Sequence, residues 1–188
     1  MTAREQEEYS ALRATIRERG TARVCVFAGG IAAWAAAMIA TAALTSTPVA
    51  TLLPLLVLAS VFEAVFALHV GVERIGRYLQ LFHEADGTGG SYGAGGSDGP
   101  AGWEHAAMAF GRPAGAAATD ALFTVPFLLA ALFNAAPALM LEPARVELVF
   151  VGGAHALFVL RLLVARQAAG KQRAIDLERF QQLKNGNG

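Results

Sequence analysis

Long apolar runs alternate with polar segments along this chain, and the alternation predicts four helices that cross a membrane. The segment 24–46 contains no charged residue and exceeds the roughly 18 residues that mark a spanning helix. Segments 49–72, 121–141 and 148–165 are similarly apolar. A cleaved signal peptide is the competing interpretation of 24–46. Its length and the acidic residues ahead of it favour a retained helix.

The polar segments between and beyond these runs predict further elements. The N-terminal segment spaces apolar residues by three and four, which is typical of an amphipathic helix. The predicted fold is therefore an all-α, four-transmembrane-helix bundle with amphipathic cytoplasmic helices at both ends. Its predicted parts are an N-terminal helix (1–22), a transmembrane hairpin whose second helix extends into the cytoplasm (23–84), a glycine-rich flexible linker (85–102), a short interfacial helix (103–113), a second transmembrane hairpin (120–166), and a C-terminal helix and tail (167–188).

The distribution of charge predicts an orientation. The chain has 15 Lys and Arg against 15 Asp and Glu, and this balance argues against nucleic acid as a partner. Most basic residues lie in the two terminal segments or in the central connection, whereas the opposite turns hold only Arg145. Because positive residues stay cytoplasmic, we expect a multi-pass protein of the plasma or inner membrane with both termini inside. Expected interface anchors are Trp103, Tyr78, Arg74 and Arg77.

Small residues suggest where the helices pack closely. In lipid, helices associate where glycine and alanine let their backbones approach. The pairs Gly29–Gly30 and Gly152–Gly153 are the candidates. The many alanines beside the first pair predict that helix 24–46 is central and well packed.

Four polar residues fall inside the apolar runs, where an ionisable group is a functional hypothesis by default. Counting about 1.5 Å per residue places Glu63 and Arg161 at one depth, and Asn134 and His155 at another. We expect a buried ion pair between the first two and a hydrogen bond between the second two. Two alternatives are that Arg161 extends to the membrane surface, and that Glu63 serves an ion or proton pathway.

Residues for catalysis or metal binding are few. His69 and Glu73 are spaced by four and form a weak metal candidate, and Cys25 is the only cysteine. No nucleophile motif is present, so we expect neither an enzyme nor a cofactor. The composition favours a structural or interaction subunit that meets the lipid bilayer and either partner membrane subunits or further copies of itself. The alternative is a small oligomeric channel or transporter that uses Glu63, His155 or both.

Overall fold

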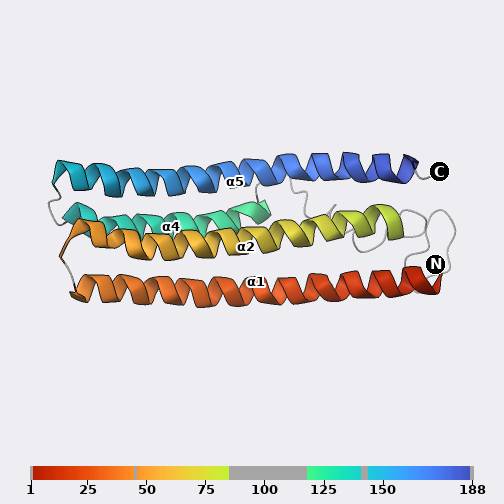
Figure 1. The fold of residues 1–188 in the computed structure, drawn as a ribbon, viewed down its shortest axis with the longest axis horizontal. Helices are drawn as coiled ribbons and strands as arrows, with labels where there is room; N and C mark the ends of the chain where they lie inside the picture. The colour runs from red at the N-terminus through yellow and green to blue at the C-terminus, as the bar shows by residue number, and fades with distance from the viewer. Residues whose placement is uncertain (1, 45, 85–117, 141–143, 187–188) are drawn as a thin grey trace. The chain divides into compact units, whose positions relative to one another are not determined.

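The computed structural model describes residues 2–44, 46–84, 118–140 and 144–186, and nearly all of these residues are helical (Figure 1). The all-α prediction and its four helices are confirmed. The predicted linker 85–102 and the interfacial helix 103–113 with Trp103 lie outside the described residues. The elements are α1 (Ala3–Leu44), the 3-10 turn η1 (Pro48–Thr51), α2 (Leu52–Leu79), the π-helical turn η2 (Gln80–Glu84), α4 (Ala118–Met140) and α5 (Arg145–Gly186).

Helices α1 and α5 each run without interruption through a polar segment and an apolar segment, which the sequence analysis gives as separate parts of the chain. Each contains 42 residues without a break. Neither holds a proline, and a single interior glycine such as Gly20 or Gly170 costs only about 1 kcal/mol. In the described part of the chain, three helices are long and apolar enough to cross a membrane. The apolar part of α4, Thr124–Met140, is shorter.

The chain divides into two compact units. The apolar unit comprises Ala22–Ala67 and Asp120–Ala168. The charged unit comprises Met1–Thr21, Leu68–Thr119 and Ala169–Gly188. Each unit is described separately below.

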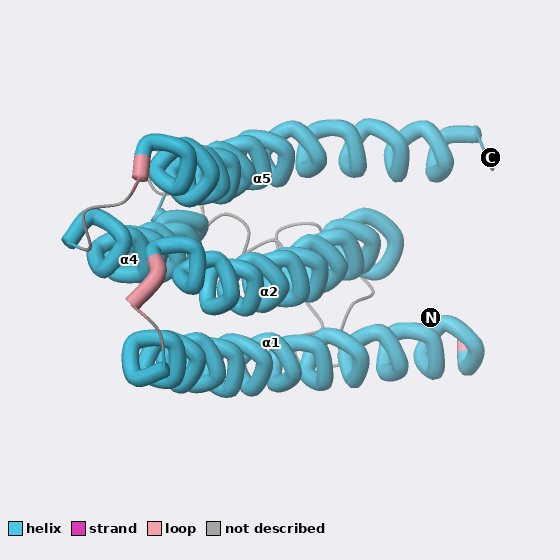
Figure 2. Tube along the Cα trace, turned by 60° about the vertical axis from the view of Figure 1, so that its left-hand side comes forward, coloured by secondary structure: helices cyan, strands magenta, loops and turns pink. Residues whose placement is uncertain are grey.

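Aromatic side chains form the centre of the apolar unit, where segments of α1, α2, α4 and α5 lie side by side (Figure 2). The Phe62 ring of α2 lies edge-on to Phe127 of α4 at 5.3 Å and to Phe158 of α5 at 6.2 Å, measured between ring centroids. Such pairs stabilise a core beyond the area they bury. Helix α1 adds Phe27, 5.8 Å from Phe127. Because α1 has no buried residue, the prediction that it is the central helix is wrong.

The four predicted packing glycines differ in their surroundings. A Cβ atom built on Gly30 would overlap both Cγ atoms of Val61, so α1 and α2 approach closely there. A Cβ on Gly29, Gly152 or Gly153 would meet no atom of another described helix within 4 Å. Of these four glycines, Gly30 alone packs against another described helix of the same copy.

Replacing Gly30 by alanine is expected to destabilise the apolar unit by about 1 to 3 kcal/mol, because the new methyl group overlaps the short, stiff side chain of Val61. Thermal unfolding of the detergent-solubilised chain, followed by circular dichroism, measures the loss. Gly29→Ala is the matched control, since it adds the same methyl group to the same helix in open space. Equal melting temperatures for the two variants would contradict the close approach.

Candidate functional site

A buried amide joins α1, α4 and α5 of the apolar unit to the turn η1 that precedes α2. Asn134 of α4 is 0% exposed. Its Nδ2 donates to the Thr51 carbonyl oxygen at 2.8 Å and lies 2.9 Å from His155 Nε2. Its Oδ1 accepts a hydrogen bond from Trp34 Nε1 at 3.2 Å. Trp34, Thr51, Asn134 and His155, here called the Asn134 junction, come from α1, η1, α4 and α5.

The hydrogen bonds fix the tautomer of His155. Its Nδ1 lies 2.8 Å from the Val151 carbonyl oxygen, which can only accept, so Nδ1 carries the proton. The Nε2 of the neutral ring then accepts from Asn134. Both hydrogens of the Asn134 amide are used in this way. The junction is therefore a closed network, and such networks give a core a unique arrangement.

The structure brings Asn134 and His155 together, as the depth count predicts, and adds two groups that the sequence analysis missed. Thr51 contributes a backbone carbonyl, which no side-chain pattern reveals. Trp34 is the only aromatic polar residue in its apolar run. That isolation was the available signal, because a buried indole N–H generally finds a partner.

Glu63 and Arg161 also meet, but on the surface of the apolar unit. Arg161 Nη2 donates to Glu63 Oε2 at 2.7 Å, and the Arg161 guanidinium lies 5.6 Å from the centre of the Phe66 ring. The two side chains are 42% and 48% exposed, for Arg161 and Glu63 respectively. The predicted burial of this pair is therefore wrong for a single copy. Arg161 binds Glu63, in contrast to the alternative in which it extends away.

Helix geometry explains the exposure of this pair. Phe62 and Leu162 point into the core. One residue along a helix turns the side chain by about 100°. Glu63 follows Phe62 and Arg161 precedes Leu162, so both charged groups leave the core at its edge and meet each other there.

The charged unit is held by a second network. Arg77 is 2% exposed, and its Nη2 donates to Asp176 Oδ2 at 2.8 Å. Glu73 accepts from Arg77 at 3.3 Å and from Arg173 Nη2 at 2.6 Å. Arg74 Nε reaches the same Asp176 oxygen at 3.3 Å. In contrast to the predicted interface anchor, Arg77 is buried in the charged unit, where its guanidinium binds the Asp176 carboxylate of α5.

The network determines the charge of its two acids. Burial raises the pKa of Glu73, but the Arg173 hydrogen bond and the nearby His69 and Arg77 outweigh it and leave that pKa below its ordinary value. Burial likewise raises the pKa of Asp176, and the hydrogen bonds from Arg77, Gln172 and Arg74 lower it by more. Both carboxylates therefore stay ionised at neutral and mildly acidic pH.

The remaining anchor and metal candidates also belong to this unit. Burial, followed by the hydrogen bond that its hydroxyl donates to Glu8 Oε1 at 2.7 Å, raises the pKa of Tyr78 to about 12. Its ring packs on Phe82 and Phe180. His69 Nε2 lies 3.4 Å from Glu73 Oε1. The described residues contain no group of three metal-binding side chains, so this pair gains no third ligand there.

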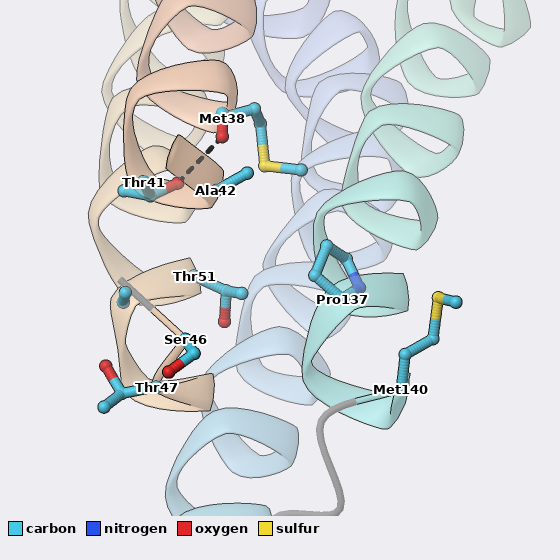
Figure 3. Close-up of a pocket in the computed structure, with 9 residues that line it drawn as sticks. Met38, Thr41, Ala42, Ser46, Thr47, Thr51, Pro137 and Met140 are labelled. Atoms are coloured by element: carbon cyan, nitrogen blue, oxygen red, sulfur yellow. Dashed lines mark hydrogen bonds between the residues drawn. The ribbon is translucent and has the colours of Figure 1, made fainter. Parts of the chain in front are cut away.

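A cavity of about 330 Å³ lies in the apolar unit between the end of α1, the 46–51 connection and the end of α4 (Figure 3). Its lining is mostly apolar, with Met38 from α1 and Pro137 and Met140 from α4. The Thr41 hydroxyl donates to the Ala37 and Met38 carbonyls, and the Thr51 hydroxyl donates to the Pro48 carbonyl. These two hydroxyls are satisfied by backbone, and none of the described residues that line the cavity is charged.

Comparisons of this chain with protein-family models, with curated proteins and with solved structures gave no match.

Proposed function

We propose that this chain is an integral membrane protein that acts as a structural or interaction subunit of a membrane assembly. In this proposal the apolar unit lies in the bilayer, and the charged unit lies on the cytoplasmic side with both termini. Helix length and hydropathy support the membrane placement, and the excess of Lys and Arg in the terminal segments and the central connection supports the orientation.

One observation carries the interaction role: the half-exposed ion pair of Glu63 and Arg161 on an apolar surface. Exposed leucines surround it, including Leu56 and Leu160. Charged groups in contact with lipid tails are costly, and in membrane proteins they usually face other protein or a water-filled cavity. A protein surface that covers this pair removes the cost.

The Asn134 junction supports the same conclusion. His155 is nearly buried and uses both ring nitrogens in hydrogen bonds. A histidine that passes protons needs a neighbour that can take up or give one, such as water or a carboxylate, whereas its two partners here are amide groups. The junction therefore suits a role in fixing helix positions better than a role in a polar pathway.

Native mass spectrometry of the full chain, extracted gently from its own membrane, tests this proposal. We expect an oligomer or a complex with other membrane subunits. A bare monomer in several mild detergents and in lipid nanodiscs would overturn the proposal. If the chain instead carries ions into liposomes and Glu63→Gln abolishes the flux, the channel or transporter alternative replaces it.

A further inference from the structure

One surface of the apolar unit combines opposite charges with exposed apolar side chains. We call it the α2–α5 face and define it by Leu56, Ser60 and Glu63 of α2 and by Leu160, Arg161 and Val164 of α5. All six are exposed or partly exposed. In α2 the three residues are spaced by four and three, and in α5 Val164 follows Leu160 by four and Arg161 by three, so each trio lies within about 100° of its helix. The Glu63–Arg161 bond joins the two sides.

The charged groups on this face are far from saturated. A guanidinium has five N–H donors, and among the described residues Arg161 uses one of them, toward Glu63 Oε2. The other oxygen of the Glu63 carboxylate accepts no hydrogen bond from these residues. The guanidinium carbon lies 5.9 Å from the centre of the Phe62 ring and 5.6 Å from that of the Phe66 ring. The pair can therefore bind a second pair of the same kind.

We infer that two copies of this chain associate through the α2–α5 face about a twofold axis, with Glu63 of each copy bound to Arg161 of the other. This inference rests on the proposed function and specifies its partner. A twofold interface is self-complementary. If residue i of the first copy contacts residue j of the second, then residue j of the first copy contacts residue i of the second. An adjacent acid and base satisfy that condition, because a half-turn places each charge opposite its counterpart.

The apolar rim fits the same partner. Leu56, Leu160 and Val164 flank the charges with side chains that a second copy would match with its own. The small Ser60 lies beside Glu63, and its hydroxyl is already satisfied by the Leu56 carbonyl at 2.9 Å. Small residues let helices approach closely in lipid. In the dimer, the two faces together form a neutral centre of four charges that is surrounded by apolar side chains.

A mixing experiment with charge-reversed chains tests reciprocal pairing directly. In Glu63→Arg both residues are positive, and in Arg161→Glu both are negative. For each variant alone, the fraction of chain found as dimer should fall at least about tenfold, because like charges then meet across the axis. Mixed together in nanodiscs, the two variants place opposite charges across the axis. Native mass spectrometry should show a heterodimer that recovers to near the wild-type level.

Cross-linking keeps the inference testable if the reversed chains fail to fold. In a Cys25→Ser background that retains both charges, Ala64→Cys places a thiol beside Glu63, and Leu132→Cys places one on the exposed side of α4. A short bis-maleimide should link Ala64→Cys copies at least about tenfold faster than Leu132→Cys copies. Equal cross-linking rates for the two cysteine variants would overturn the inference. So would dimers that persist in both charge-reversed variants when these variants fold.

These outcomes separate the inference from the proposed function. If the wild-type chain is found only with different membrane proteins, or dimerises through another surface, the α2–α5 inference fails and the subunit role stands. If the wild-type chain is a bare monomer, both fail.

Discussion

Replacing Asp176 by alanine should lower the free energy of unfolding of the charged unit by about 3 to 5 kcal/mol, the range for breaking a buried ion pair from one side. The reason is the position of Arg77. Its guanidinium is 2% exposed, and Asp176 is its shortest charged contact at 2.8 Å. Without that carboxylate, Glu73 at 3.3 Å is the one acidic partner left to Arg77 among the described residues, and Glu73 is already shared with Arg173.

The loss is measured by thermal unfolding of the full chain in detergent and by hydrogen exchange of the amides in α2 and α5. Glu178→Ala is the matched control, because it removes an exposed carboxylate two residues further along α5. Its effect should stay within about 0.5 kcal/mol. The double variant Arg77→Leu with Asp176→Leu should recover much of the stability, since apolar residues can replace a buried pair at little cost. Equal effects for Asp176→Ala and Glu178→Ala would show that the network contributes little.

The second large effect is expected from Asn134→Leu, which should destabilise the apolar unit by about 3 to 5 kcal/mol. Leucine is similar in size but leaves three groups without their partner: the half-buried Trp34 indole N–H, and the buried Thr51 carbonyl and His155 Nε2. Each such group costs about 1 to 3 kcal/mol. Some of that cost is offset because the new side chain is apolar.

Trp34 reports on this variant directly. The chain has two tryptophans, so Trp103→Phe leaves Trp34 as the single fluorophore. Loss of the hydrogen bond to Asn134 should shift its emission to shorter wavelength while the melting temperature falls. Phe133→Leu is the control, because Phe133 is the exposed neighbour of Asn134 on α4. An unchanged Trp34 spectrum in Asn134→Leu would exclude the junction.

Sequence reasoning finds the four helices and which of their polar residues lie at the same level, because both depend only on run length and helical rise. It does not predict whether those residues face the core or the surface of the bundle. In a soluble protein the apolar stripe of a helix marks its inner side. Here leucines occur on both the inner and outer sides of α2, as buried Leu58 and exposed Leu56 show. Depth counting therefore pairs Glu63 with Arg161 correctly but places the pair inside.

The role of α1 shows a different limit. Its glycines and alanines predict close packing, and Gly30 meets Val61 closely. Its contacts with α4, however, are made by large side chains, with Phe27 against Phe127 and Trp34 against Asn134. The bond from Arg77 to Asp176 spans 99 positions between two polar segments. Local spacing holds no information about such a partner, and only the packed helices reveal it.

The Asn134 junction has a consequence for the synthesis of this protein. Trp34 and Thr51 precede Asn134 by 100 and 83 positions. At about 5 to 20 residues per second, the ribosome needs several seconds to some 20 seconds to supply that amide. During this interval the newborn α1–α2 hairpin carries an indole N–H and a carbonyl oxygen whose final partner has yet to be made. Until α4 is made, these two polar groups of the nascent hairpin therefore lack the partner that they have in the complete apolar unit.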